Sequence, residues 1–299
     1  MKIDGVVISC YVLDVYLTRV CVASIRFWYP DLPIWLLKDR QYGDFDTHEI
    51  ENKWNVEGYP SRQKKLGWGL GKLDVLTDPP ARRLLLLDSD IVFTGRLIDR
   101  LEEFDEDLIV ESFDETAFEE EFFSFADARK FDPRFEFPSY GFNTGQLVAT
   151  TAKITKQDFA ELVDWQTRTV LHPKVFKMGE QGVLNYVALR KAQQGELSIR
   201  REPFMVRPGK GDRAAHIQLK DLNSEGQNRQ LIHWAGLRWG KSLEKMPRSE
   251  ILLHFEKIYY KRVPFGRLLR EWRLMLFRVD RTFITPVKIL VKKALRKLR

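Results

Sequence analysis

The sequence predicts an α/β protein built around a mostly parallel β-sheet, and three observations support this fold class. Gly5–Cys10 has the composition of a strand, Val15–Tyr29 that of a helix, and Ile34–Leu37 that of a second strand. Short connections between a strand, a helix and a further strand are typical of a parallel sheet. Leu84–Leu87 is a run of four leucines, which indicates a strand buried on both faces.

Length and composition set the scale of the protein. With 299 residues and 44% hydrophobic content, the chain can form one large α/β domain, with or without an appendage. Its two cysteines, Cys10 and Cys21, lack the spacing of a metal site and lie in apolar segments. We therefore expect them in the core of a protein from a reducing compartment. The apolar run Val6–Val12 is too short for a membrane span and lacks the small-residue cleavage pattern of a signal peptide, so we expect a cytoplasmic protein.

Two carboxylates follow the leucine strand directly, in Asp88-Ser89-Asp90. Burying a charge is costly unless the charge is paired or bound to metal. Ligands of open α/β sheets bind beyond the carboxyl ends of the strands, which is where these aspartates lie. Paired carboxylates suit a hard divalent cation such as Mg²⁺ or Mn²⁺. A simple turn or helix cap is the alternative interpretation, because Asp and Ser favour both.

The segments on either side of this strand are predicted as follows. Gln41–Ser61 is polar and is expected to form an irregular loop over the site. Leu66–Leu76 contains three glycines and Lys72, and we expect a loosely formed helix that brings this lysine towards the site. A phosphate-binding P-loop is disfavoured, because Leu73 stands where that motif requires Ser or Thr. Leu97–Leu101 is predicted to be a short helix.

The middle of the chain contains further elements. Leu108–Glu111 is predicted to be a strand, and Tyr140–Val148 a turn that leads into another strand. Between them, residues 113–137 are rich in phenylalanine, which favours a small subdomain packed on its own rings; an aromatic platform for a sugar or lipid is the alternative. Asp158–Leu171 is expected to form an amphipathic helix, and Glu180–Leu189 another helix.

One histidine stands apart from the others. His233 follows an apolar pair within Gln230–Gly240, where a short strand is predicted to end in a loop. Gly236 in that loop allows the backbone to approach a ligand closely. An imidazole can complete a Mn²⁺ site with two carboxylates, although a packing role is the alternative. The remaining histidines are interpreted as surface or packing residues: His48, His172, His216 and His254.

Five short segments together resemble a known group of enzymes. The segments are Val6–Cys10, LLLLDSD (84–90), GFNTGQLV (141–148), GEQGVLN (179–185) and LIHWAG (231–236). In this order they resemble the nucleotide-diphospho-sugar transferases of the GT-A fold, in particular glycosyltransferase family eight. The resemblance implies a GT-A, Rossmann-like, mostly parallel sheet flanked by helices in residues 1–245. Residues 246–299 would then form a basic, amphipathic helical C-terminal extension.

The resemblance also implies roles for individual residues. Asp88, Asp90 and His233 would bind the metal, and Asp88 would also lie at the ribose side of the nucleotide. Glu180 and Gln181 fall on the family's Asp-Gln pair, the sugar-binding acid and the residue beneath the anomeric carbon. The other implied donor-binding positions are Ser9, Cys10, Tyr11, Asn143, Thr144, Gly236, Arg238 and Lys241. Lys72 stands where the family usually has an arginine that contacts the donor phosphate or sugar.

These residues form a consistent chemical set. A divalent metal can act as a Lewis acid on a departing nucleotide diphosphate. Lys72, with Arg238 or Lys241, would add electrostatic stabilisation. No acidic residue is an obvious general base, which together with Gln181 favours retention of configuration. We therefore expect a metal-dependent glycosyltransferase that uses a nucleotide sugar, with UDP implied by the resemblance.

Two alternative functions remain open at this point. One is a sugar-nucleotide nucleotidyltransferase, which is disfavoured because the N-terminus lacks a glycine- and arginine-rich triphosphate loop. The other is a non-catalytic sugar-nucleotide binder or membrane adaptor. The set of Asp88, Asp90 and His233 argues against that function, because a scaffold needs no metal ligands.

The C-terminal segment carries most of the positive charge. Residues 261–299 hold thirteen Lys or Arg and two acids, whereas the whole chain has a net charge of +7. Pro286–Arg299 has helical apolar spacing, and Leu268, Leu269, Trp272 and Leu276 show a similar spacing upstream. A basic amphipathic helix with a tryptophan predicts binding to an anionic membrane surface at its inner face, and a glycan or glycolipid acceptor would fit this location. Docking on the protein's own core is an alternative; nucleic acid is not an expected partner, because no recognition motif accompanies the basic residues.

Overall fold

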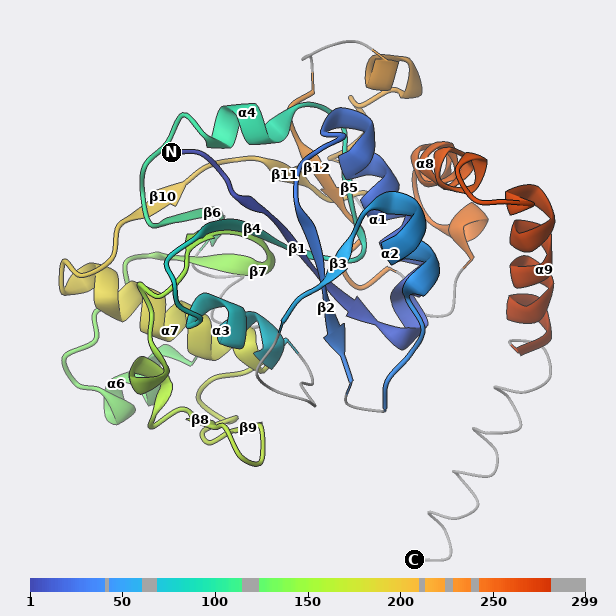
Figure 1. Ribbon diagram of the computed structural model, residues 1–299. Helices are drawn as coiled ribbons and strands as arrows, with labels where there is room; N and C mark the ends of the chain where they lie inside the picture. The colour runs from blue at the N-terminus through green and yellow to red at the C-terminus, as the bar shows by residue number, and fades with distance from the viewer. Residues whose placement is uncertain are drawn as a thin grey trace, which may run out of the picture. The chain divides into compact units, whose positions relative to one another are not determined.

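The computed structural model describes residues 1–40, 43–60, 69–114, 124–209, 213–223, 228–237 and 242–280. The chain divides into two compact units, Met1–Ala235 and a second unit that begins at Gly236. The first unit is an α/β structure, and the described part of the second consists mainly of two helices, α8 and α9 (Figure 1).

The first unit is built on a central sheet, which has seven strands in the described part of the chain, in the order β10-β6-β7-β4-β1-β2-β3. These strands are β1 (Gly5–Tyr11), β2 (Ile34–Asp39), β3 (Glu57–Gly58), β4 (Arg83–Asp88), β6 (Leu108–Asp114), β7 (Tyr140–Thr150) and β10 (Ile199–Arg201). β7 is antiparallel to both of its neighbours, β4 and β6, and the other neighbouring pairs are parallel. The predicted α/β fold with a mostly parallel sheet is confirmed.

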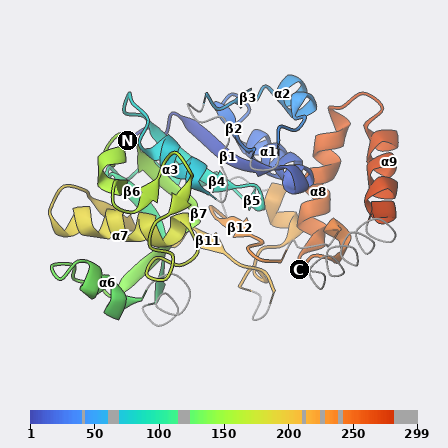
Figure 2. The same cartoon turned by 90° about the horizontal axis from the view of Figure 1, so that it is seen from below.

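β4 is the centre of this sheet, between β1 and β7. Its leucines Leu84–Leu87 are at most 1% exposed, as expected for a strand buried on both faces. Val7, Leu84 and Leu86 belong to the core that is shared with α3 (Leu70–Leu76) and α7 (Glu180–Gln193). α1 (Val15–Trp28) contacts β1 and β5, and Figures 1 and 2 show α1 and α7 on opposite sides of the central strands.

A second, small sheet joins distant parts of the chain. It contains β11 (Met205–Val206), β12 (Leu231–His233) and β5 (Ile91–Phe93), with β12 antiparallel to β5. The remaining strands form a short hairpin, and the remaining helices of this unit are short. They are β8 (Val163–Asp164), β9 (Thr169–Val170), α2 (His48–Trp54), α4 (Leu97–Leu101) and α6 (Phe125–Phe131). The short helix predicted at Leu97–Leu101 is therefore confirmed.

The interpretation of Gln41–Ser61 as an irregular loop was wrong. The described part of this segment contains α2 and the edge strand β3. Ile50 and Trp54 are each 1% exposed and are spaced by four residues, so they form the buried face of a short helix. The segment is polar in composition because its other face is solvated, and this composition concealed the helix.

The helix predicted over Asp158–Leu171 is also wrong. A 3₁₀ turn ends at Phe159, and the hairpin β8–β9 follows. The Asp164 carboxylate accepts hydrogen bonds from the backbone amides of Gln166 and Thr167, at 2.8 and 3.1 Å. Such local bonds compete with the helical pattern and favour a turn. Apolar spacing alone did not reveal this competition.

The phenylalanine-rich segment is described from Ser124 onwards, so Phe118, Phe122 and Phe123 lie outside the described residues. The Phe131 ring packs edge-on against the rings of Phe176 and Tyr186. Phe135 also contacts the Tyr186 ring, and Phe125 contacts Phe137. These rings therefore pack on one another and on α7.

The second unit contains α8 (Ser249–Lys261) and α9 (Gly266–Val279). The Arg270 guanidinium lies 2.8 Å from Glu256 and 3.3 Å from Glu244, which ties one face of α9 to the preceding segments. The helix predicted over Pro286–Arg299 lies outside the described residues. Within the described ranges, no helix is both long and apolar enough to cross a membrane.

Candidate active site

Strand register brings three chemically active side chains together. β4 ends at Asp88, the chain turns through Ser89 and Asp90, and β5 begins at Ile91. β12 pairs with β5 so that His233 lies opposite Ile91. The backbone N–H of Trp234 donates to the Asp90 carbonyl at 3.0 Å and continues this pairing. His233 therefore reaches the two aspartates although it is far from them in the sequence.

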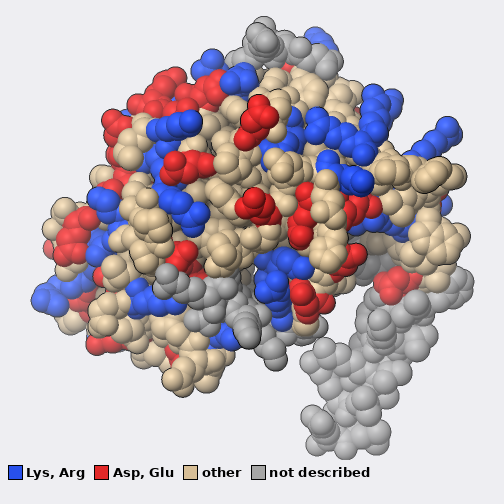
Figure 3. Space-filling model, viewed as in Figure 1, with Lys and Arg blue, Asp and Glu red and all other residues tan. Residues whose placement is uncertain are grey.

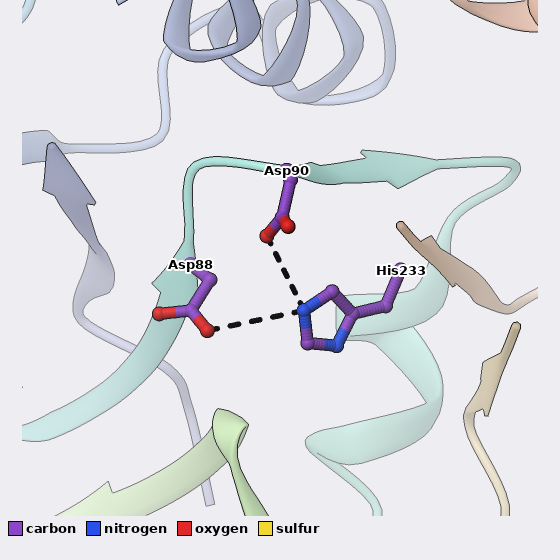
Figure 4. A group of neighbouring side chains, drawn as sticks. All are labelled: Asp88, Asp90 and His233. Carbon is purple, nitrogen blue, oxygen red and sulfur yellow. Dashed lines mark ion pairs between the residues drawn. The ribbon is translucent and has the colours of Figure 1, made fainter. Parts of the chain in front are cut away.

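The three side chains can surround one ion (Figure 4). His233 Nε2 lies 3.2 Å from Asp90 Oδ1 and 3.8 Å from Asp88 Oδ2. One potential ligand atom from each residue lies within 4.8 Å of the others. Asp90 and His233 are each 2% exposed, whereas the Asp88 side chain is 30% exposed and so opens the group to solvent.

A buried glutamine orients the histidine. His233 Nδ1 lies 3.0 Å from Gln146 Oε1, which as an amide oxygen can only accept a hydrogen bond. This contact fixes the orientation of the ring, and Nε2 faces the two aspartates. This is the arrangement in which an imidazole binds a metal ion, with its other nitrogen held by a hydrogen bond. Two carboxylates and one imidazole fit Mn²⁺ well, and the carboxylates also suit Mg²⁺.

The backbone of β7 approaches this group at Gly145. A Cβ atom at this position would lie 2.5 Å from His233 Cε1, 2.8 Å from Asp88 Oδ2 and 2.6 Å from Asn143 Oδ1. Asn143 Oδ1 also accepts a hydrogen bond from the Gly145 amide at 2.6 Å. The space between the histidine and Asp88 therefore exists because residue 145 has no side chain.

Lys72 lies behind Asp88. Its Nζ donates to Asp88 Oδ1 at 2.6 Å and to the Thr144 carbonyl at 2.8 Å, and its side chain is 3% exposed. The buried ammonium thus contacts the Asp88 carboxylate and the Thr144 carbonyl, and it offsets part of the negative charge of Asp88. The structure places Lys72 at the predicted site, in contact with a predicted metal ligand.

Glu180 is the first residue of α7, next to the same group of side chains. Thr144 Oγ1 donates to its carboxyl at 3.3 Å, and the residue is 8% exposed. Burial raises the pKa of Glu180 to about 7, the positive charge of Lys72 opposes this shift, and the negative charge of Asp88 adds to it. Gln181 follows, and its Oε1 is buried without a hydrogen-bond partner among the described residues.

Replacing Glu180 with glutamine should change how stability depends on pH. The pKa of Glu180 rises from 4.5 to about 7 on folding, so its contribution is fully present below pH 4.5 and is lost as the pH rises through 7. Each pKa unit is worth about 1.4 kcal/mol, so the wild type should lose on the order of 3 kcal/mol relative to Glu180→Gln. Denaturant unfolding between pH 4.5 and 8 measures this difference. The same substitution at the exposed Glu161 is the control, and parallel pH profiles for wild type and Glu180→Gln would contradict the prediction.

The other predicted donor-binding residues lie at several places. Ser9 is opposite Asp88 at the end of β1, and Tyr11 is opposite Asp39. The Cys10 side chain faces the core, where Sγ lies 3.1 Å from Thr18 Oγ1, and burial raises the pKa of this thiol to about 12. Gly236 has a φ of +72° and belongs to the second unit. Arg238 and Lys241 lie outside the described residues.

Sequence inspection missed two residues that order the site, Gln146 and Asn185. Thr144 and Gln146 are two residues apart on β7, so they share a face, and this polar pair in a buried strand was a usable signal. The Asn185 side chain donates to the Phe142 carbonyl at 2.9 Å and accepts from the Phe142 amide at 2.8 Å. It also donates to the Gln181 carbonyl at 2.9 Å, so a fully buried asparagine joins the start of α7 to β7.

Comparisons with known proteins give a result at the level of structure. No protein-family model and no curated protein sequence matches this chain. The apo structure of the bifunctional glycosyltransferase WbbM matches with a TM-score of 0.56 and 14% identity, over 87% of this chain and 52% of that one. The galactosyltransferase LgtC, solved with donor and acceptor sugar analogs, matches with a TM-score of 0.53 and 15% identity, over 87% of this chain and 96% of LgtC.

A third match is the apo form of the glycosyltransferase GlyE from Streptococcus pneumoniae, with a TM-score of 0.53 and 15% identity. It covers 93% of this chain and 64% of GlyE. The chain thus spans about half the length of WbbM, less than two thirds of GlyE, and nearly all of LgtC. At these identities the similarity establishes the fold, and the chain has the GT-A fold of these glycosyltransferases.

Proposed function

We propose that the protein is a metal-dependent glycosyltransferase. It transfers a sugar from a nucleotide-diphosphate donor, with UDP as the expected nucleotide, to a hydroxyl of a glycan or glycolipid. The observation that carries the proposal is the convergence of Asp88, Asp90 and His233 within 4.8 Å, in a GT-A fold. Retention of configuration rests on the resemblance, which implies a position for Gln181 beneath the anomeric carbon.

The residues of the site have separate tasks in this proposal. Asp88, Asp90 and His233 would hold Mn²⁺ or Mg²⁺, and a bound ion supplies Lewis acidity for the departing diphosphate. Gln146 holds the imidazole ring of His233 so that its Nε2 faces the two aspartates. Lys72 fixes the Asp88 carboxylate and compensates part of its charge. Glu180 and Gln181 present polar atoms for the hydroxyls of the donor sugar.

Incubation with a panel of nucleotide sugars, with and without Mn²⁺, tests the function. We expect release of a nucleoside diphosphate that depends on the metal, because an ion held by the three residues would supply positive charge for the leaving group. Coupled detection of UDP and of pyrophosphate separates the alternatives. Pyrophosphate formation from a nucleoside triphosphate and a sugar phosphate would instead identify a nucleotidyltransferase. Binding without turnover would identify a sugar-nucleotide binder.

We also propose that the C-terminal extension, residues 246–299, binds an anionic membrane surface at its inner face. The supporting observation is a stripe of exposed apolar side chains along α9 and the residue before it. These residues are Phe265, Leu268, Trp272, Met275, Leu276 and Val279, which are 41% to 83% exposed. In Figure 3 the part of α9 that faces the viewer is mostly tan. α9 also carries four arginines and one glutamate, a composition that favours anionic lipid over a second copy of the same basic helix.

Substitution of Leu268 and Trp272 by glutamate should weaken this binding. Both side chains are more than half exposed, so the change leaves the packing of α9 intact. We expect binding to phosphatidylglycerol vesicles to fall by about tenfold or more, because two apolar anchors become charged. Cosedimentation with the vesicles measures this binding. Leu171→Glu, which makes the same change at another exposed leucine, is the control. Equal binding of all variants would contradict the proposal, as would a dimer that depends on Trp272.

A further inference from the structure

Two helix starts lie against each other beside the candidate metal group. Gly69 immediately precedes α3, and Glu180 is the first residue of α7. A Cβ atom on Gly69 would lie 2.1 Å from Glu180 Cδ and 2.3 and 2.4 Å from its two carboxyl oxygens. Side-chain atoms do not approach a Cβ so closely, so the Glu180 carboxyl occupies space that only a glycine at position 69 leaves open.

The same helix also contacts one of the candidate metal ligands, Asp88. Lys72 lies in the first turn of α3, and its amide donates to the Gly69 carbonyl at 2.8 Å. Its ammonium contacts Asp88 and the Thr144 carbonyl, while the Thr144 hydroxyl donates to Glu180. The start of α3 therefore fixes Asp88 on one side and the Glu180 carboxyl on the other, with Thr144 between them.

A buried carboxyl beside a group of metal ligands is suited to a polar ligand. The free energy of burying Glu180 is unfavourable for folding alone, which marks it as a functional candidate. Its oxygens can accept hydrogen bonds from the hydroxyls of a bound sugar, and the strength of such bonds depends on position within a fraction of an ångström. A displacement of about 1 Å in an active site can change rates by about a hundredfold.

We propose that Gly69 is a positioning residue that sets the sugar specificity of the donor site, because it determines where the Glu180 carboxyl lies. This inference rests on the proposed glycosyltransferase function. It also implies that positions 69 and 180 depend on each other. A side chain at 69 displaces the glutamate, whereas the one-methylene-shorter aspartate at 180 leaves room for it.

A double-mutant cycle tests this dependence. The variants are Gly69→Ala, Glu180→Asp and the double substitution, assayed for kcat/KM with UDP-galactose and UDP-glucose in the presence of Mn²⁺. Gly195→Ala is the matched control. Gly195 has the same φ of +75° as Gly69, but no described heavy atom lies within 4 Å of the position that a Cβ would take there. The control therefore also places an alanine at a positive φ, without the steric conflict.

We expect Gly69→Ala to change the ratio of kcat/KM for the two sugars by about tenfold or more, and Gly195→Ala to leave that ratio unchanged. In the Glu180→Asp background, the alanine at position 69 should have a much smaller effect, because the shorter side chain removes the conflict. Additive effects, or equal ratios for Gly69→Ala and Gly195→Ala, would overturn the inference.

The thermal unfolding midpoints of the same four proteins separate this inference from the proposed function. If wild type turns over no nucleotide sugar, the proposed glycosyltransferase function fails. The contact between residues 69 and 180 is still supported if the alanine at position 69 lowers the midpoint less in the Glu180→Asp background than in wild type. Additive drops would overturn the contact as well. If Gly69→Ala alone does not fold, the sugar ratios of Glu180→Asp and the double variant decide. Similar ratios for these two support the inference, and divergent ratios refute it.

Discussion

Asp90→Asn should abolish metal-dependent sugar transfer and weaken Mn²⁺ binding by more than about a hundredfold. Loss of a residue that only supports a metal ligand typically costs about 10- to 100-fold, and Asp90 supplies a ligand atom itself. It is 2% exposed and lies 3.2 Å from His233 Nε2, so water cannot easily replace its carboxylate. The asparagine has nearly the same shape, and we therefore expect the fold to persist.

Calorimetric titration with Mn²⁺ measures the binding, and UDP release measures the transfer. Asp31→Asn makes the same chemical change at an exposed position and should leave both quantities unchanged. Retained Mn²⁺ affinity in a folded Asp90→Asn protein would show that the three residues do not form the metal site. Activity that is lost while Mn²⁺ still binds would instead give Asp90 a role in catalysis without ligation.

The sequence was sufficient to predict the central strand and its two aspartates. An uninterrupted run of leucines after a turn signal predicts a strand buried on both faces, and carboxylates at its end then have few structural explanations. The prediction that His233 lies at the end of a short strand was also correct. The reason for its proximity to Asp90 was not visible, however. The two meet because β12 pairs with β5 in a separate small sheet, which is a long-range register that local patterns do not encode.

The direction of β7 explains most of what the sequence did not reveal about the site. β7 is antiparallel to β4 and pairs Gln146 with Leu87, so its middle residues lie at the site. Gln146 and Gly145 therefore acquire roles that depend on strand direction. Likewise, the contact between Gly69 and Glu180 joins two helix starts that are far apart in the chain, and no local pattern could predict it.

Gly145→Ala should disrupt the candidate metal site without changing a single ligand. The new methyl group would lie 2.5 Å from His233 Cε1 and 2.8 Å from Asp88 Oδ2, and both distances are shorter than the van der Waals contact distance. Gly145 has an ordinary strand conformation in β7, so the effect is steric and does not come from backbone strain. Overpacking of a well-packed interior typically costs about 1–3 kcal/mol of stability. We expect a loss of this size, and a loss of Mn²⁺ affinity because the imidazole and the carboxylate are forced apart.

Gly58→Ala is the matched control for this prediction. Gly58 also lies in a strand, β3, without a positive φ, and no described heavy atom lies within 4 Å of a Cβ placed there. Denaturant unfolding and Mn²⁺ titration of the two variants separate a local steric effect from a general effect of alanine in a strand. If Gly145→Ala binds Mn²⁺ as wild type does, the ion does not need the space between His233 and Asp88. Unchanged Mn²⁺ affinity would therefore contradict the expectation that the ion is held between the imidazole and the Asp88 carboxylate, because the added methyl group forces these two side chains apart.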